Sequence, residues 1–140
     1  MSIVHPIMLE NDWEFRTDFS QCTGDQILGK NSIFEVYLAA DKNITSRASV
    51  PVLWDIKQAT IVSDESSEII GMFNPAFEKI SVNELDLYPR TLRTEIDELN
   101  FMIYENVNNG VYKTGFATSL KSYTEPFMKL FECLEEYEQR

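Results

Sequence analysis

The distribution of apolar and polar residues predicts two neighbouring strands near the middle of the chain. Residues 50–55, Val-Pro-Val-Leu-Trp-Asp, form an apolar run, and a shorter one at residues 59–62 follows a polar turn at Lys57 and Gln58. Two such runs joined by a short turn are typical of an antiparallel pair. A proline cannot donate a hydrogen bond to a sheet, so Pro51 indicates either a sheet edge or a backbone that faces a ligand.

Apolar residues spaced about one helical turn apart predict two helices in the N-terminal half. The first covers residues 31–40, and either Asn31 or Ser32 can cap its start. The second follows a polar cluster at residues 63–67 and ends before Pro75. The predicted apolar faces consist of Ile33, Phe34, Tyr37 and Leu38 in the first helix, and of Ile69, Ile70 and Phe73 in the second.

After a connector at residues 77–87, the pattern is helical from Pro89 onward. One long apolar stripe predicts a helix of about four turns or more. The Asn-Asn-Gly sequence at residues 108–110 is expected to end this helix, because Asn and Gly readily adopt the left-handed conformation. An aromatic-bearing loop would then cover residues 111–118. The stripe consists of Leu92, Ile96, Leu99, Ile103 and Val107.

A last helix is predicted to begin at Ser119 or at Thr124. In the first case Pro126 would kink the helix, and in the second it would lie in the first turn. Two antiparallel helices cannot fully bury their apolar faces against each other. The apolar stripe of this helix consists of Phe127, Leu130, Phe131, Leu134 and Tyr137.

The first thirty residues are less regular. Residues 3–8 indicate a short strand that Pro6 interrupts, and residues 18–30 have the composition of a loop. Trp13 and Phe15 lie in a polar loop between them. An aromatic residue in such a setting either covers the core or contacts a ligand, and the residues alone favour the first interpretation.

Composition and charge narrow the possible functions. Hydrophobic residues make up 44% of the 140 residues, which is enough to bury a core. The formal charge of −11 disfavours binding to nucleic acid or to an anionic membrane surface. No apolar run approaches the roughly 20 residues of a membrane-spanning helix, and the first residues do not resemble a secretory signal, so we expect a cytoplasmic protein.

Few residues suggest catalytic or metal chemistry. Cys22 and Cys133 lie far apart and outside any Cys-x-x-Cys motif, and His5 is the single histidine, so we expect neither a disulfide framework nor a metal site. The predicted helix start at Glu65 and Ser66 is more informative. Helix openings carry unpaired N–H groups and partial positive charge, so this junction could receive an anion such as a carboxylate.

Four segments of the sequence together resemble one known family. They are residues 50–55 (VPVLWD), 61–70 (IVSDESSEII), 96–100 (IDELN) and 108–118 (NNGVYKTGFAT). They resemble the glutathionyl-hydroquinone reductases, which form the omega-like xi class of glutathione transferases. The resemblance runs in register from about Ile3 to the last helix, and its Asn-Asn-Gly-Val-Tyr-Lys block is specific to this class.

The resemblance implies an α/β, thioredoxin-like glutathione-binding domain, present in part at residues 1–75. The first helices of an all-helical domain would follow at residues 76–140. It also implies a reaction in which a cysteine thiolate takes glutathione off a glutathionyl-hydroquinone. A second glutathione then resolves the mixed disulfide. The implied partners are glutathione, as co-substrate, and a hydroquinone-type small molecule, and the parent family is expected to be homodimeric.

The resemblance also assigns roles to individual residues. Trp13 would contact glutathione, Arg47 would lie near its glycyl end, and Val50, ahead of a cis Pro51, would offer its backbone to the cysteinyl part. Glu65 and Ser66 would hold the γ-glutamyl end, and Tyr112 would line the quinone site.

The chain departs from the family at the nucleophile. The Cys-Pro-Trp-Ala motif is absent, because Met1 falls where the family's second strand begins. Neither Cys22 nor Cys133 replaces it, so no catalytic residue is predicted in this chain. The missing first strand is central in the family fold, so we also expect a monomer of the isolated chain to be poorly stable.

Three hypotheses remain open. They are a fragment of a glutathionyl-hydroquinone reductase, a non-catalytic glutathione-binding or protein-interaction module, and a small α/β piece whose aromatics are core. Retention of Trp13, Glu65, Ser66 and Tyr112 favours the first, because a binding module has no use for the quinone tyrosine.

Overall fold

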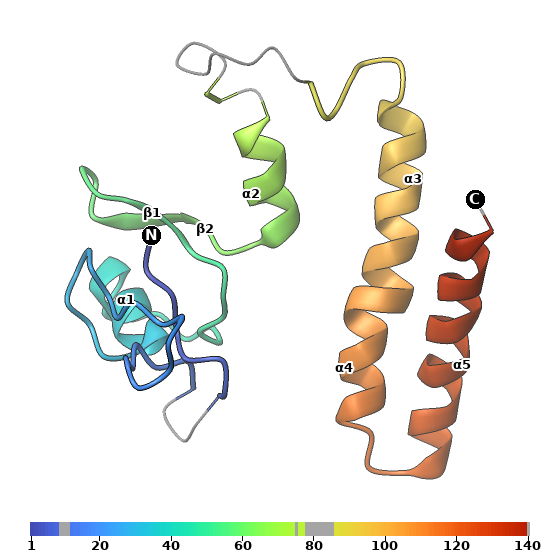
Figure 1. Ribbon diagram of the computed structural model, residues 1–140, viewed down its shortest axis with the longest axis horizontal. Coiled ribbons are helices and arrows are strands. Elements are labelled where there is room, and N and C mark those ends of the chain that lie inside the picture. Colours follow the sequence, from blue (N-terminus) through green and yellow to red (C-terminus); the bar gives the residue numbers. More distant parts are fainter. Residues whose placement is uncertain (9–11, 75, 78–85, 140) are drawn as a thin grey trace. The chain divides into compact units, whose positions relative to one another are not determined.

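The computed structural model describes residues 1–8, 12–74, 76–77 and 86–139. The chain divides into two compact units, Met1–Asn83 and Glu84–Arg140, called here the N-terminal and C-terminal units (Figure 1). Their elements in chain order are α1 (Ile33–Ala40), β1 (Leu53–Asp55), β2 (Thr60–Ser63), α2 (Ser66–Phe73), α3 (Arg93–Ile103), the π-helix η1 (Tyr104–Asn108), α4 (Asn109–Gly115) and α5 (Leu120–Glu138). The domain boundary predicted after residue 75 stays a prediction, and most of the predicted connector lies outside the described residues.

Helix α1 forms where the sequence predicts it. Of the two possible caps, Ser32 is the one used, because its hydroxyl accepts a hydrogen bond from the Glu35 N–H at 3.4 Å. The buried face differs by one residue from the predicted one. Val36 is buried between Ile33 and Tyr37, whereas the predicted Phe34 is exposed. The core of the N-terminal unit consists of Ile33, Val36, Tyr37 and Ala48.

Strands β1 and β2 pair antiparallel, as predicted, with Leu53 opposite Ser63, Trp54 opposite Ile61 and an irregularity between Leu53 and Trp54. Strand β1 is shorter than the predicted run. Val50 and Pro51 lie ahead of the strand, where a proline without an N–H interrupts no ladder. The peptide bond between these two residues is cis, as predicted.

Residues 3–8 do not form the predicted strand. Ile3 makes an isolated bridge to Gly24, and its N–H donates to the Thr23 hydroxyl at 2.8 Å. The segment faces the loop at residues 18–30 instead of a strand, so no ladder extends from this bridge. The loop itself is confirmed, and the Asp25 carboxylate organises it.

Asp25 accepts hydrogen bonds from three backbone N–H groups of the loop, those of Ile27, Leu28 and Lys30, at 2.9–3.2 Å. Partial burial opposes ionisation of this carboxyl group. The hydrogen bonds from the backbone outweigh it and hold the pKa of Asp25 below its ordinary value. The loop therefore owes its conformation to one ionised side chain.

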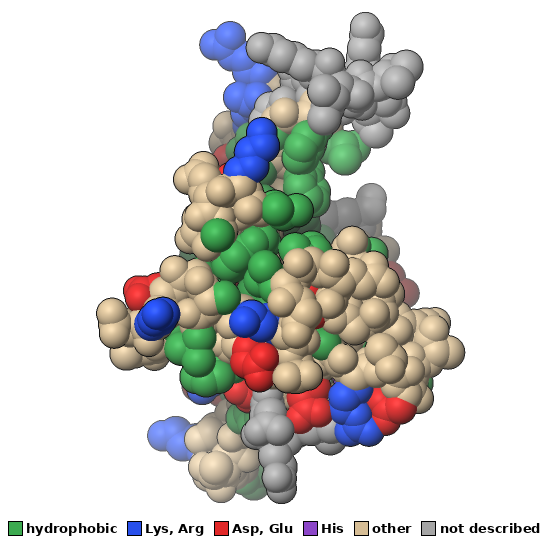
Figure 2. Space-filling model, turned by 90° about the vertical axis from the view of Figure 1, so that its left-hand side faces the viewer, with side chains coloured by type: hydrophobic (Ala, Val, Ile, Leu, Met, Phe, Trp, Pro, Cys, Tyr) green, Lys and Arg blue, Asp and Glu red, His purple; other side chains and the backbone are tan. Residues whose placement is uncertain are grey.

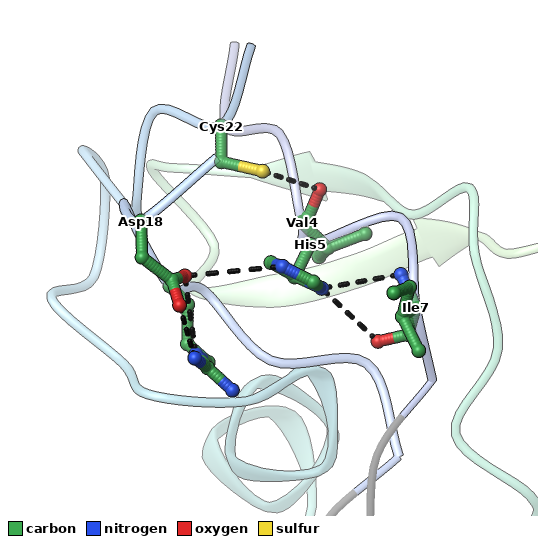
Figure 3. A network of polar contacts seen from close by, with 6 residues as sticks. Val4, His5, Ile7, Asp18 and Cys22 are labelled. Carbon is green, nitrogen blue, oxygen red and sulfur yellow. Dashed lines mark hydrogen bonds and ion pairs between the residues drawn. The ribbon is translucent and has the colours of Figure 1, made fainter. Parts of the chain in front are cut away.

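Polar contacts also join the first residues to this loop (Figure 3). The Cys22 thiol donates to the Val4 carbonyl at 3.4 Å, and His5 Nδ1 accepts from the Ile7 N–H at 3.2 Å. The other ring nitrogen of His5 lies 3.8 Å from the Asp18 carboxylate. These contacts account for both Cys22 and His5 as parts of the structure.

Helix α2 begins and ends as predicted, but most of its apolar face is not covered within the described residues. Ile69 is buried, whereas Ile70 is 69% and Phe73 is 49% exposed. Hydrophobic side chains gather in the middle of the face that the N-terminal unit turns to the viewer in Figure 2. The other strongly exposed apolar side chains of this unit include Ile7, Ile56 and Val62.

The C-terminal unit corrects the prediction for residues 108–118. The helical path does not end at Asn108–Gly110 but continues from α3 through η1 into α4, which ends at Gly115 (Figure 1). Gly110 is buried, and a Cβ on it would lie 3.6 Å from the Leu130 Cβ. Gly110 therefore lies inside a helix at the contact with Leu130 rather than in a left-handed turn, and a Cβ would fit there. The predicted loop is reduced to the connection after α4.

Helix α5 begins at Leu120 with Ser119 as its cap, so Pro126 lies inside the helix. It runs antiparallel to α3 and α4 (Figure 1). Leu130 and Cys133 are buried, while Phe131 is 53% and Leu134 is 44% exposed. On the facing side, Ile96, Leu99, Ile103 and Val107 are half-buried. The incomplete burial expected for two helices is therefore found.

Replacing Gly110 with alanine tests the helical assignment, since the two backbone conformations predict opposite signs. In the helix, the added Cβ makes an ordinary van der Waals contact with Leu130, and alanine has a helix propensity better by about 0.8–1 kcal/mol. We expect the free energy of unfolding to rise by about 0.5–1 kcal/mol in urea denaturation followed by circular dichroism. A left-handed Gly110 would instead lose about 1–2 kcal/mol on the same substitution.

Candidate functional site

Two segments of the N-terminal unit that the sequence singles out are tied to one side chain of α1. The Tyr37 hydroxyl donates to the Asp64 carboxylate at 2.8 Å and accepts from the Ser49 N–H at 3.3 Å. Ser49 directly precedes Val50, and Asp64 directly precedes Glu65. Tyr37 therefore brings the turn ahead of β1 and the start of α2 to the same place.

The turn ahead of β1 presents a free backbone. Val50 is half-buried and packs against the core, and Pro51 is exposed. Within the described residues, neither the N–H nor the C=O of Val50 makes a hydrogen bond. A peptide can pair with such groups as if it were another strand. Arg47, three residues earlier, is exposed, and no described residue pairs with its guanidinium group.

The start of α2 carries two acidic side chains in capping positions. Glu65 is the N-cap, and its carboxylate accepts from the Ser67 hydroxyl at 3.2 Å. The buried Ser63 hydroxyl accepts from the Glu65 N–H at 3.1 Å and donates to the Glu68 carboxylate at 2.8 Å. Negative charge is favourable at a helix N-terminus. The exposed Ser66 hydroxyl has no partner among the described residues, so it is available to a ligand.

Trp13 shows one of the two roles that the sequence left open, and contact with a ligand stays a prediction. Its half-buried side chain packs against the core cluster of Ile33, Val36, Tyr37 and Ala48, which is the covering role. Its carbonyl accepts from the Ile33 N–H at 2.9 Å and so fixes the start of α1. Val50 packs against the same cluster, so Trp13 lies on the same core as the turn that the sequence assigns to glutathione.

Tyr112 lies in the C-terminal unit, on α4, and 66% of its surface is exposed. It lines a cleft of about 650 Å³ formed by η1, α4 and α5. Its ring is parallel to that of Phe116, with centroids 6.3 Å apart. Lys113 and Lys129 also line the cleft, and each pairs with a glutamate. The cleft thus offers a flat aromatic surface beside charged groups.

The sequence did not predict a role in the site for Tyr37, Ser49 or Asp64. A signal was present, because Tyr37 lies on the predicted apolar face of α1, and a buried tyrosine hydroxyl usually has a hydrogen-bond partner. The partner itself, 27 residues away in sequence, follows from the tertiary structure alone. Among the described residues, no group of three or more His, Cys, Asp and Glu side chains could hold a metal ion. No helix in the same ranges is long and apolar enough to cross a bilayer.

The pKa of Tyr37 predicts a stability change at high pH. Burial raises this pKa, and the adjacent Asp64 carboxylate adds to the shift, while the hydrogen bonds from Ser49 oppose it. The folded state therefore holds the proton more tightly than the unfolded state. The resulting stability is fully present below about pH 10 and is lost as pH rises through the raised pKa.

We expect the N-terminal unit to lose stability more steeply above about pH 10 in the wild-type chain than in Tyr37→Phe, which lacks the titrating group. Both tryptophans, Trp13 and Trp54, lie in this unit, so tryptophan fluorescence during urea denaturation reports on it alone. Parallel pH dependences of the two proteins would contradict the assignment.

Comparison with known proteins gives relatives along nearly the whole chain. The chain is 51% identical over 139 residues to glutathionyl-hydroquinone reductase YqjG of Escherichia coli strain K12. It is 45% identical over 141 residues to glutathione S-transferase omega-like 2 of Schizosaccharomyces pombe. These alignments cover 99% and 98% of this chain but only 42% and 45% of the relatives. No family model matches the chain.

Solved structures agree with these relatives. The glutathione-bound structure of YqjG from Escherichia coli K-12 matches 99% of this chain with a TM-score of 0.93 and 51% identity. The chain is a homologue of the xi-class glutathione transferases. The crystal structure of glutathione-S-transferase Xi from Phanerochaete chrysosporium matches the same share with a TM-score of 0.94 and 42% identity.

The predicted fold class is thereby confirmed. The N-terminal unit corresponds to part of the glutathione-transferase N-terminal domain, and the C-terminal unit to the first helices of the domain that follows. This xi-class homologue spans a little under half the length of the curated relatives it matches. The roles of Trp13, Arg47, Val50, Pro51, Glu65, Ser66 and Tyr112 stay predictions.

Proposed function

We propose that the N-terminal unit binds glutathione, and that the protein to which this chain corresponds in part is a glutathionyl-hydroquinone reductase. The proposal rests on the agreement between a sequence similarity and a contact in the structure. The chain is 51% identical to a glutathionyl-hydroquinone reductase, and in this chain the Tyr37 hydroxyl joins the two segments that the family resemblance assigns to glutathione.

The chemistry of each segment suits one end of the tripeptide. The unpaired backbone of Val50 can pair with the cysteinyl residue, as strand addition requires. The Glu65 carboxylate can accept from the γ-glutamyl ammonium, and the Ser66 hydroxyl can donate to the adjacent carboxylate at the helix N-terminus. Arg47, exposed and unpaired within the described residues, can reach the glycyl carboxylate. Trp13 contributes by holding the start of α1.

Reduction of a glutathionyl-hydroquinone requires a nucleophilic thiolate, and the described cysteines do not suit this role. Cys133 is 4% exposed in the C-terminal unit. The half-buried Cys22 thiol donates a hydrogen bond to the Val4 carbonyl. A reactive cysteine needs an accessible, electropositive site. This chain would therefore supply glutathione recognition, and the cleft beside Tyr112 a part of the hydroquinone site.

The absence of a suitable thiol also favours a second candidate, a non-catalytic glutathione-binding module. Neither candidate predicts catalytic turnover by the 140-residue chain. We expect no thiol-dependent reduction of a glutathionyl-hydroquinone by this chain, with or without Cys22→Ser and Cys133→Ser. Activity that either substitution abolishes would show that the nucleophile lies here and would overturn our assignment. The predicted cytoplasmic location and homodimer also stay predictions.

Glutathione binding itself is tested by isothermal titration calorimetry of the 140-residue chain. We expect glutathione to bind at least about tenfold more tightly than the dipeptide Cys-Gly, because the dipeptide lacks the γ-glutamyl contacts, and one charge-assisted hydrogen bond contributes about 1.5–3 kcal/mol. Equal affinities for the two peptides, or no heat with millimolar glutathione, would refute glutathione recognition by this chain.

A further inference from the structure

We propose that Tyr37 is a positioning residue that holds the two halves of the glutathione site in a fixed relative placement. In doing so it would set the preference for glutathione over peptides that lack the γ-glutamyl residue. The inference rests on the proposed function, because it concerns the same site. It adds a residue that does not touch the ligand but determines how well both ends of the ligand are met at once.

A hydroxyl group donates one hydrogen bond and accepts up to two. The shortest contact of the Tyr37 hydroxyl, 2.8 Å to Asp64, uses its proton. Its oxygen is then the acceptor for the Ser49 N–H at 3.3 Å. One atom thus serves both segments, and phenylalanine at this position could serve neither.

The position of this oxygen is itself well defined. Tyr37 is 2% exposed and lies on α1 among Ile33, Val36 and Ala48, so its ring has little freedom to move. A tyrosine hydroxyl is protonated at neutral pH, and burial and the adjacent carboxylate raise the pKa of Tyr37 further, so the donor is present. Tyr37 therefore fixes the positions of both segments relative to the packed core of the unit.

The two contacts lie one residue from the groups that would bind glutathione. Ser49 precedes Val50, and Asp64 precedes Glu65 and Ser66. A ligand that contacts both segments gains binding free energy from both only if the distance between the segments matches its length. The second contact is then made without further loss of the ligand's translational and rotational freedom. Glutathione spans both segments. Cys-Gly contacts only the Val50 segment, so its affinity does not depend on the distance between the two segments.

The test compares glutathione with Cys-Gly by calorimetry for four variants. Tyr37→Phe keeps the ring in the core and removes the hydroxyl, and Asp64→Ala removes the acceptor from an exposed position. Asp64→Asn keeps an oxygen that can accept the same hydrogen bond. Tyr88→Phe is the matched control, because Tyr88 also donates to an aspartate, Asp97 at 2.5 Å, but in the C-terminal unit.

We expect the ratio of the two dissociation constants to fall about tenfold in Tyr37→Phe and in Asp64→Ala, through weaker binding of glutathione with Cys-Gly changed less than twofold. Asp64→Asn and Tyr88→Phe should keep the wild-type ratio. A Tyr37→Phe protein that loses both peptides equally would show a purely structural role and overturn the proposal. If Tyr37→Phe does not fold, an unchanged ratio in Asp64→Ala overturns it equally.

Amide hydrogen exchange without ligand separates this inference from the proposed function. We expect Tyr37→Phe to reduce protection of the hydrogen-bonded amides of Ser49 and Glu65 together, and Tyr88→Phe to change neither. Suppose that both segments lose protection together but the wild-type chain does not bind glutathione. The proposed function and the ligand preference would then be refuted, while the role of Tyr37 in positioning the two segments would stand. A wild type that binds glutathione while Tyr37→Phe loosens only one segment, or neither, would refute the positioning alone.

Discussion

Replacing Leu130 with alanine is expected to lower the free energy of unfolding of the C-terminal unit by about 2–5 kcal/mol. Leu130 is 7% exposed and packs on Gly110, which has no side chain to fill the space that the substitution would open. Apart from Gly110, Leu130 and Cys133, no described residue of this unit is buried. A loss of this size is therefore a large share of what two packed helices can supply.

The measurement is urea denaturation followed by circular dichroism, to which α3, η1, α4 and α5 contribute most of the helical signal. Leu120→Ala is the control, because Leu120 is 82% exposed on the same helix and its truncation should stay within about 0.5 kcal/mol of the wild type. Equal effects of the two substitutions would contradict the close packing of α4 on α5.

Glu65→Gln is expected to weaken glutathione binding by about 10- to 100-fold, which corresponds to the 1.5–3 kcal/mol of a charge-assisted hydrogen bond. Glutamine keeps an oxygen that can accept from Ser67 and so preserves the cap of α2. What it removes is the negative charge that would meet the γ-glutamyl ammonium. The substitution therefore separates ligand binding from helix capping, which Glu65→Ala would confuse.

The matched control is Glu68→Gln. Glu68 carries the same charge on the same helix, but its carboxylate is engaged by the Ser63 hydroxyl. We expect its glutathione affinity to stay within about threefold of the wild type, since only the general charge of the helix start changes. A second control uses glutathione without its α-amino group. Glu65→Gln and the wild type should bind this ligand with equal affinity. Equal losses in the two glutamine variants would refute a direct role for Glu65.

The exposed apolar residues bear on the stability expected of the chain. The sequence predicts buried faces that include Ile70 and Phe73 on α2 and Phe131 and Leu134 on α5, yet each of these side chains is 44–69% exposed among the described residues. The sequence pattern therefore indicates more burial than these elements provide for one another. The poor stability of an isolated monomer stays a prediction, and a sharp cooperative unfolding transition in a monomeric sample would contradict it.

The sequence by itself determined the elements whose signals are local. Helix α1 with a polar cap, the β1–β2 pair around the turn at Lys57 and Gln58, and α2 behind Glu65 follow from periodicity, capping and turn chemistry within a few residues. The family resemblance, and with it the fold class and the candidate site, also came from short motifs. These motifs lie in register, so no tertiary information was needed to see them.

Only the tertiary structure decided what depends on distant partners. Gly110 suits a left-handed turn and a helix equally well, and the packing of Leu130, twenty residues on, selects the helix. Residues 3–8 have the composition of a strand, but their backbone meets a loop, so no ladder forms. Tyr37 looks like an ordinary core residue until the fold brings Ser49 and Asp64 to its hydroxyl. In each case the outcome depends on contacts between residues distant in sequence, and these contacts form only when the chain is folded.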